Sequence, residues 1–259
     1  MNDNNFYSEY NDYESQNEVK SHSLSKTTIH FVGAYFWMFI ATFITFITGV
    51  LLSKVLVNII YKGNATGMTI FLVLSIASFI AQLILCFSIQ KASLVNANYG
   101  KALGGLIAFS ILNGLSFASI FVFFDLTVLY QIFGAVSAFF LVLTLLSYLF
   151  RNKIHKASGF AYIGLFTLLI VSGLVSIYSL IFYSPTNNIS ESLFLGVSIL
   201  GLIVFTILTL VDVKAMYNIV DNSSNKKCAA ISAAFNLYLD FINIFIYILR
   251  IVAHFIKRD

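Results

Sequence analysis

Charged residues are scarce in this sequence. Asp, Glu, Lys and Arg together make up 10% of its 259 residues, whereas 59% of the residues are hydrophobic and the mean hydropathy is +0.90. Soluble domains carry about 25% charged residues. The composition therefore excludes a soluble globular protein and indicates a chain that crosses a membrane several times.

Proline and cysteine are also nearly absent. One Pro stands against 27 Phe, and long runs of Leu, Ile and Val replace the alternating pattern of a barrel strand, which favours helical spans. The two cysteines, Cys86 and Cys228, have neither the spacing of a disulfide framework nor that of a metal knuckle. We interpret them as packing residues.

Runs of about 20 apolar residues predict seven transmembrane helices. They lie near residues 31–57, 68–90, 102–124, 128–150, 159–183, 192–213 and 229–250. The single proline, Pro185, falls between the fifth and sixth runs, where a loop is expected. Small residues within the runs allow helices to pack closely; they form the pairs Gly100/Gly104, Gly159/Gly164 and Gly196/Gly201.

The chain divides at the first apolar run. Residues 1–28 are rich in Asn, Ser, Glu, Asp and Tyr and contain too few apolar residues to pack a core, so we predict a disordered, acidic cytoplasmic tail. Because acidic residues occupy that tail, no signal peptide is expected there. Residues 29–259 are predicted to form the seven-helix transmembrane domain.

Basic residues indicate the orientation. The net charge is +4, but Lys and Arg are spread over short loops between spans, which is typical of a topology signal and not of a nucleic-acid surface. One side collects ten, Lys20, Lys26, Lys91, Lys101, Arg151, Lys153, Lys156, Lys214, Lys226 and Lys227, and the other five, Lys54, Lys62, Arg250, Lys257 and Arg258. The N-terminus is therefore predicted to be cytoplasmic. The basic tail RIVAHFIKRD would favour the same side, which seven complete spans do not allow; a re-entrant last helix would satisfy both.

A carboxylate interrupts the last apolar run. Asp240 lies within LYLDFINIF, although an ionised Asp in the middle of a span costs roughly 2.5–3.5 kcal/mol. Asn236, Asp240, Asn243 and Tyr247 fall at i, i+4, i+7 and i+11 and so share one helix face. Such a stripe can join helices through hydrogen bonds, but an ionisable residue favours an ion or proton path.

A second carboxylate, Asp212, lies near the cytoplasmic end of the sixth run. The turn DNSSNKK is centred near Ser224, so that Asp212 lies 12 residues before the centre and Asp240 lies 16 after it. In an antiparallel hairpin their depths differ by about 6 Å, and we expect the two side chains to meet. Two such carboxylates cannot both ionise cheaply in a poorly solvated site, so the pair should titrate as a coupled unit.

The same pair is suited to calcium. Two ionised carboxylates offer up to four hard oxygen ligands, whereas calcium takes six to eight. Asp212 and Asp240 are therefore the predicted metal-binding residues, and calcium would be a weakly bound or permeant ion, not a tightly bound cofactor. Gln82 and Asn113 could line the same cavity or form hydrogen bonds between helices.

At these residues the sequence resembles the Bax inhibitor family of membrane proteins. NLYLDFINIFIYILRI at 236–251 is similar to the family's C-terminal signature and VDVKAMYN at 211–218 to its sixth-span motif. NGLSFASIF at 113–121 and RNKIHKASGFAYIG at 151–164 match further stretches. The resemblance implies an all-α bundle of seven transmembrane helices with the last helix central, which acts as a pH-sensitive calcium leak controlled by Asp212 and Asp240.

The sequence departs from the family at two places. Val211 precedes Asp212, where the family often has Tyr. Bacterial relatives also carry arginines at the end of the second span that can latch onto the first aspartate, whereas this chain has Gln90 and Lys91. A latch through Lys91 should be looser, because an ammonium group lacks the bidentate fork of a guanidinium.

Three functions follow as hypotheses. The first is a pH-gated calcium leak in a bacterial cell membrane, or in the endoplasmic reticulum of a eukaryote. The second is a membrane-embedded regulator that binds a membrane protease or a stress or cell-death partner without conducting ions. The third, an intramembrane aspartyl protease, is disfavoured because Leu237, Tyr238 and Leu239 stand where a Gly-x-Gly sequence would precede the Asp; we do not expect an enzyme.

Overall fold

The computed structural model describes the backbone of residues 3–149, 157–181 and 189–256, and the side chains of residues 30–147, 149, 159–179 and 191–256. Pro185, the loop residues 151–156 and the last three residues lie outside these ranges. The described elements are α1 (Asp3–Tyr61), α2 (Ala65–Gln90), the π-helix η1 (Lys91–Val95), α3 (Tyr99–Phe121), α4 (Leu126–Leu149), α5 (Ala157–Ile181), α6 (Ile189–Asn222) and α7 (Lys226–Ile256).

Seven helices in the described part of the chain are long and apolar enough to cross a membrane. They coincide with the seven predicted runs, and the described residues contain no strand. α6 and α7 continue beyond the predicted runs because a helix does not have to end where its apolar residues end. The fold class predicted from the sequence is confirmed.

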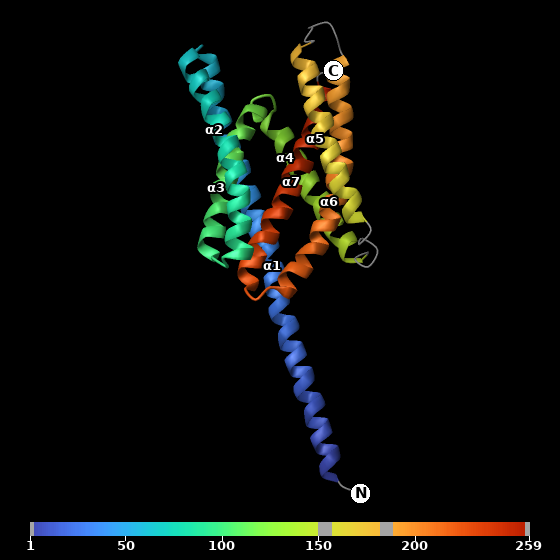
Figure 1. The fold of residues 1–259 in the computed structure, drawn as a ribbon. Coiled ribbons are helices and arrows are strands. Elements are labelled where there is room, and N and C mark those ends of the chain that lie inside the picture. Colours follow the sequence, from blue (N-terminus) through green and yellow to red (C-terminus); the bar gives the residue numbers. More distant parts are fainter. Residues whose placement is uncertain (1–2, 150–156, 182–188, 257–259) are drawn as a thin grey trace.

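The last helix forms the centre of the bundle. Figure 1 shows α7 between the α2–α3 side and the α5–α6 side, and α7 contacts α1, α3, α4, α6 and η1. It buries 16 of its residues, whereas α2 buries two. Alanines at positions 229, 230, 233 and 234 let neighbouring backbones approach the first turns of α7 closely.

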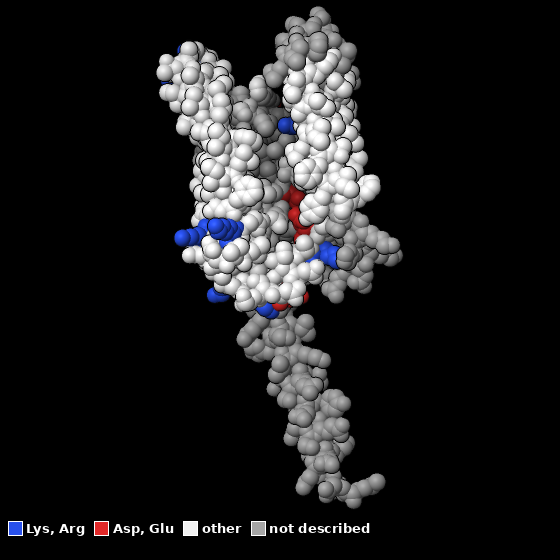
Figure 2. Space-filling model, in the orientation of Figure 1, with Lys and Arg blue, Asp and Glu red and all other residues white. Residues whose placement is uncertain are grey.

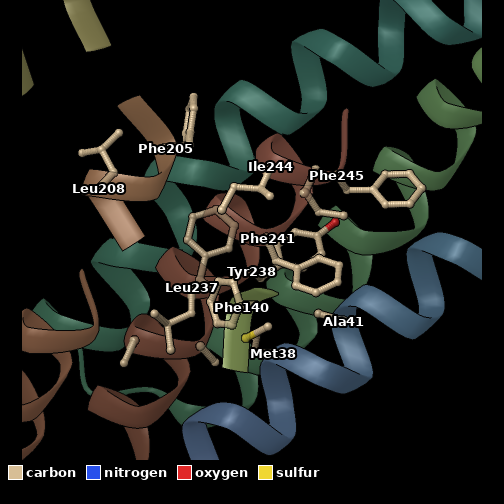
Figure 3. Packing of buried hydrophobic residues seen from close by; sticks show 14 of the residues in the cluster. Met38, Ala41, Phe140, Phe205, Leu208, Leu237, Tyr238, Phe241, Ile244 and Phe245 are labelled. Atoms are coloured by element: carbon tan, nitrogen blue, oxygen red, sulfur yellow. The ribbon is translucent and has the colours of Figure 1, made fainter. Parts of the chain in front are cut away.

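Aromatic side chains fill the space around the outer half of α7. Figure 3 shows Phe241 and Phe245 packed among residues of α1, α4 and α6. The Phe241 ring lies 5.7 Å from the ring of Phe140, and the Phe245 ring lies 6.0 Å from that of Phe117. These tilted and offset arrangements are favourable for aromatic pairs.

α7 is one uninterrupted helix of 31 residues, about 46 Å long at the rise of an α-helix. This length exceeds the hydrocarbon core of a bilayer, about 30 Å. Figure 1 shows α7 running through the bundle from the end that holds the α6–α7 turn. A re-entrant helix would reverse within the membrane, and the described α7 does not reverse.

The backbone of α1 begins at Asp3 and continues N-terminally from the bundle as a single helix. Figure 1 shows this extension projecting away from the other helices. Residues 3–28, which we predicted to be disordered, are thus helical in the structure. A helix can continue in this way because its hydrogen bonds are local and propagate from the packed span that follows.

Candidate functional site: the carboxylate pair and the polar contacts of α7

The α6–α7 hairpin positions the two aspartates. Asp212 lies ten residues before the end of α6, and Asp240 lies fourteen residues after the start of α7. The turn is fixed at Asn225, whose side-chain oxygen accepts a hydrogen bond from the backbone N–H of Cys228 over 3.2 Å. The register expected from the sequence is therefore present.

Asp240 is buried without full hydrogen bonding. The residue is 4% exposed, and its Oδ2 atom has no hydrogen-bond partner. The Thr209 hydroxyl, one turn before Asp212 on α6, is its side-chain hydrogen-bond neighbour. No Lys or Arg among the described residues forms an ion pair with Asp240. An unsatisfied buried oxygen is uncommon and calls for a proton, a cation or a water molecule.

Asp212 is half-buried and lies within electrostatic range of Asp240. Tyr162 of α5, which is 51% exposed, lies within electrostatic range of both carboxyl groups. Figure 2 shows acidic atoms at the floor of a hollow between the α2–α3 side and the α5–α6 side. Three helices thus contribute an ionisable side chain to one region, and Tyr162 was not among the residues selected from the sequence.

The first residue of the polar stripe, Asn236, contacts α2. The Gln90 Nε2 atom donates to Asn236 Oδ1 over 2.7 Å, and the Ser232 hydroxyl donates to Gln90 Oε1 over 2.5 Å. Gln90 therefore joins α2 to α7 through both atoms of its amide, directly before the π-helix η1. π-Helical turns within α-helices are frequent at functional sites.

Lys91, which we expected to form a loose latch, follows Gln90 but is exposed and forms no ion pair with a described residue. The contact between α2 and α7 is instead made by the neutral side chain of Gln90. The sequence placed Gln90 where relatives carry arginines but did not predict its contact with α7, because an amide at the end of an apolar run gives no sign of its partner.

A second hydrogen-bonded group joins α1, α3 and α7. Asn113 Nδ2 donates to the Tyr238 hydroxyl over 2.8 Å, and that hydroxyl lies 2.7 Å from Thr45 Oγ1. Thr45 in turn donates to backbone carbonyls of its own helix and of Ser110. Because a hydroxyl has one proton, the chain of donors runs from Asn113 to Tyr238, then to Thr45, then to a carbonyl. Tyr238 is completely buried, and the sequence had given it no role.

Of the remaining predicted polar residues, Gln82 joins two helices and Asn243 bonds within its own helix. Gln82 Nε2 donates to the hydroxyls of Ser78 and Ser116 over 3.0 and 3.1 Å, which joins α2 to α3. Of the two interpretations of Gln82 and Asn113, the structure therefore shows hydrogen bonds between helices. Asn243 Nδ2 donates to the carbonyl of Leu239 on its own helix over 2.7 Å.

Tyr247 ends the predicted stripe and packs against α6. Its ring covers the backbone of Gly201, and it lies 5.8 Å from the ring of Phe205. A Cβ atom added at Gly201 would lie inside the van der Waals radius of the Tyr247 ring. Through this contact, Tyr247 packs α7 closely against α6.

The described residues bring few potential metal ligands together. No group of three or more His, Cys, Asp and Glu side chains that could hold a metal occurs within the described residues. Two carboxylates on neighbouring helices can exchange protons and can contribute part of the oxygen shell of a hard cation. They cannot by themselves form a closed metal site.

Comparison with known proteins identifies the family. The model of the family described as "Inhibitor of apoptosis-promoting Bax1" matches residues 28–257. An uncharacterised protein of Borreliella burgdorferi is 30% identical over 182 residues, which is 67% of this chain and 73% of that protein. The inner membrane protein YbhL of Escherichia coli K12 is 29% identical over 66% of this chain and 71% of its own length.

A eukaryotic relative is more distant. Bax inhibitor 1 of Schizosaccharomyces pombe is 27% identical over 154 residues, 60% of this chain and 53% of that protein. No solved structure gives a significant match. The family match covers all seven spans and both aspartates, and the chain therefore belongs to the Bax inhibitor family of multi-pass membrane proteins.

Proposed function

We propose that this protein is a pH-sensitive calcium leak channel in which Asp212 and Asp240 form a protonatable gate. One observation carries the proposal: Asp240 has a buried carboxyl oxygen with no hydrogen-bond partner, within electrostatic range of a second carboxyl group. An oxygen in this position is satisfied either by a proton or by a cation, and this choice links ion binding to pH.

The protonated state fits the hydrogen bonds around Thr209. Its hydroxyl donates to the carbonyl of Phe205 over 2.7 Å. Because that proton is already used, a hydrogen bond between Thr209 and Asp240 needs the proton of Asp240. When the proton leaves, Thr209 can rotate to donate to the carboxylate, and the α6–α7 contact changes.

The ionised state fits calcium. The pair then presents up to four hard oxygens and a charge of −2, and water and carbonyl oxygens complete the coordination. Such partial coordination is weak enough for release, which conduction requires. The hollow in Figure 2 reaches the acidic atoms from one side. The hydrogen bond from Gln90 to Asn236 joins α2 to α7 one helical turn from Asp240, and in this proposal it would close the path on the other side.

Calcium flux into dye-loaded proteoliposomes tests the proposal, from about pH 5.5 to about pH 8, a range in which a coupled carboxyl pair can titrate. The wild type is compared with Asp212→Asn, Asp240→Asn and the double variant. Asp221→Asn is the matched control, because Asp221 is an exposed acid on the same helix. We expect pH-dependent flux in the wild type and the control, and no pH dependence in the pair variants. No flux in the wild type, or unchanged pH dependence in the double variant, would contradict the proposal.

The topology belongs to the same proposal. We infer a bacterial cell membrane, in keeping with the inner-membrane relative YbhL, and a cytoplasmic N-terminus. Among the described side chains, the end of the bundle that holds the α6–α7 turn carries Lys91, Lys101, Lys214, Lys226 and Lys227. A Ser224→Cys variant without the two native cysteines should not react with an impermeant thiol reagent in intact cells. Reaction would show that the α6–α7 turn faces the outside of the cell, and the inferred orientation would then be wrong.

A second candidate function is supported by the N-terminal extension of α1. This segment projects beyond the bundle, where a protein partner could reach it (Figure 1). A regulator that binds a membrane protease or a stress partner would use this extension and not the aspartates. Deletion of residues 1–28 would then remove a co-purifying partner, whereas Asp240→Asn would retain it. The channel hypothesis predicts that the deletion leaves calcium flux unchanged.

A further inference from the structure

A large cavity lies away from the aspartate pair, at the end of the bundle where α7 ends. Its volume is about 620 Å³, and it lies between the end of α3, the start of α4 and the last turns of α7. Its deeper wall is apolar, with Val128, Ile246 and Leu249 among the lining residues. Ligand pockets commonly have this size and apolar character.

Two opposite charges line the same cavity. Asp125 directly precedes α4, and its backbone carbonyl accepts the first hydrogen bond of that helix, from Leu129 N over 3.1 Å. Arg250 lies over the Tyr247 ring, with its Cζ atom 5.9 Å from the ring centroid. Asp125 and Arg250 form no ion pair with each other or with another described residue. Both charges are therefore available to a ligand.

The charged and apolar residues of this cavity lie at the depths of the headgroups and the acyl chains of one membrane leaflet. Asp125 lies in the turn between α3 and α4, and Arg250 is two turns from the last described residue of α7, Ile256. Both charges thus lie near the ends of spans, at the depth of lipid headgroups. Ile246 lies one turn deeper than Arg250, at the depth of acyl chains.

We propose that this cavity binds a zwitterionic phospholipid with a primary amine in its headgroup. Arg250 would bind the phosphate through its guanidinium fork, the headgroup ammonium would donate hydrogen bonds to Asp125, and an acyl chain would lie along Ile246 and Leu249. A headgroup without an ammonium leaves Asp125 unpaired near a phosphate. A trimethylated headgroup has no N–H donor for the carboxylate. The proposal does not depend on calcium conduction.

Thermal unfolding of the detergent-purified full chain tests headgroup selectivity. Short-chain phosphatidylethanolamine, phosphatidylcholine and phosphatidylglycerol are added at equal mole fraction. We expect phosphatidylethanolamine to raise the Tm most. Asp125→Asn should remove its advantage over phosphatidylcholine, whereas Arg250→Gln should reduce the shift for all three lipids, and Arg250→Lys should restore part of it because the positive charge remains. Lys62→Gln is the control, since Lys62 is an exposed cation at the same end outside the cavity.

Native mass spectrometry of the wild type gives a second measurement that does not depend on how well the variants fold. Protein reconstituted with an equal mixture of the three lipids should retain phosphatidylethanolamine with roughly a fivefold preference, the effect of about one charge contact near a membrane surface. Equal retention of all three lipids would overturn the proposal. Equal Tm shifts for all headgroups would do the same, and would indicate unspecific lipid packing or occupancy by a protein segment.

Discussion

The side-chain amide of Gln90 donates to the side-chain oxygen of Asn236 over 2.7 Å, one helical turn from Asp240. The same amide accepts a hydrogen bond from Ser232, which is completely buried. A neutral residue thus joins α2 to the helix that carries the buried acid. Neither amide in this contact titrates between about pH 5.5 and pH 8, so the proposed pH response would come from the aspartate pair and not from this contact.

Replacing Gln90 by Leu should loosen α2 from α7. The change leaves Ser232 and Asn236 without their partner, and we expect a loss of about 1–3 kcal/mol in the free energy of unfolding. Distances between spin labels on α2 and α7 should become longer or broader. Gln82→Leu is the control, because Ser78 and Ser116 keep hydrogen bonds to the carbonyl of Leu112. Equal broadening in both variants would show that the Gln90 contact has no special role.

Tyr238→Phe should destabilise the protein more than its small change in volume suggests. The hydroxyl lies between Asn113 and Thr45 in a fully buried position, and its removal leaves buried polar groups unpaired at a cost of about 1–3 kcal/mol. Tyr130→Phe, at a position 56% exposed, should have almost no effect. The measurement is thermal unfolding in detergent. A double-mutant cycle with Thr45→Val should give a nonzero coupling energy; an additive result would contradict the hydrogen-bond chain.

Gly201→Ala and Gly196→Ala form a matched pair on α6. A methyl group at Gly201 would collide with the Tyr247 ring, whereas nothing lies within 4 Å of one at Gly196. We expect Gly201→Ala to cost about 1–3 kcal/mol through overpacking and Gly196→Ala to be neutral or slightly stabilising, since Ala favours a helix. Adding Tyr247→Leu should restore part of the stability lost in Gly201→Ala. Equal stability of the two alanine variants would refute this packing.

Calcium and protons should compete for Asp212 and Asp240. Calcium needs the ionised carboxylates, so its binding releases protons and its affinity falls as the pH falls. If one proton is released, the affinity should fall by at most about tenfold per pH unit. Calcium titrations of the purified protein at several pH values measure this slope. Asp240→Asn should weaken calcium binding and reduce the dependence of calcium affinity on pH. If that dependence is unchanged in the variant, the proton released on calcium binding comes from another group.

The fold could be predicted because the membrane imposes a simple requirement on the sequence of each spanning helix. About twenty apolar residues are needed for each crossing, so hydropathy alone locates all seven helices. The approach of Asp212 to Asp240 could be predicted as well, because a short turn fixes the register of two consecutive helices. The π-helical turn at Lys91–Val95 could not, because it depends on how α2 and α3 meet.

Contacts between helices far apart in the sequence were harder to foresee. Tyr238 resembles many interfacial tyrosines, and only the packing of α1 and α3 around it shows that its hydroxyl is buried. The glycine pairs illustrate the same limit: a Cβ atom at Gly201 would collide with a ring, whereas nothing lies within 4 Å of one at Gly196 or Gly104. Spacing identifies residues that can allow close approach, and the neighbouring helix decides which of them does.

The central position of α7 has a consequence for how the protein is made. Thr45 and Tyr238, which contact each other in the finished bundle, are separated by 193 positions in the chain. At a synthesis rate of about 5–20 residues per second, Tyr238 emerges roughly 10–40 s after Thr45. Until the seventh helix arrives, Thr45, Gln90 and Asn113 lack the partners that they have on it in the finished bundle. A chain that ends before residue 238 therefore lacks most of the helix around which the other helices pack.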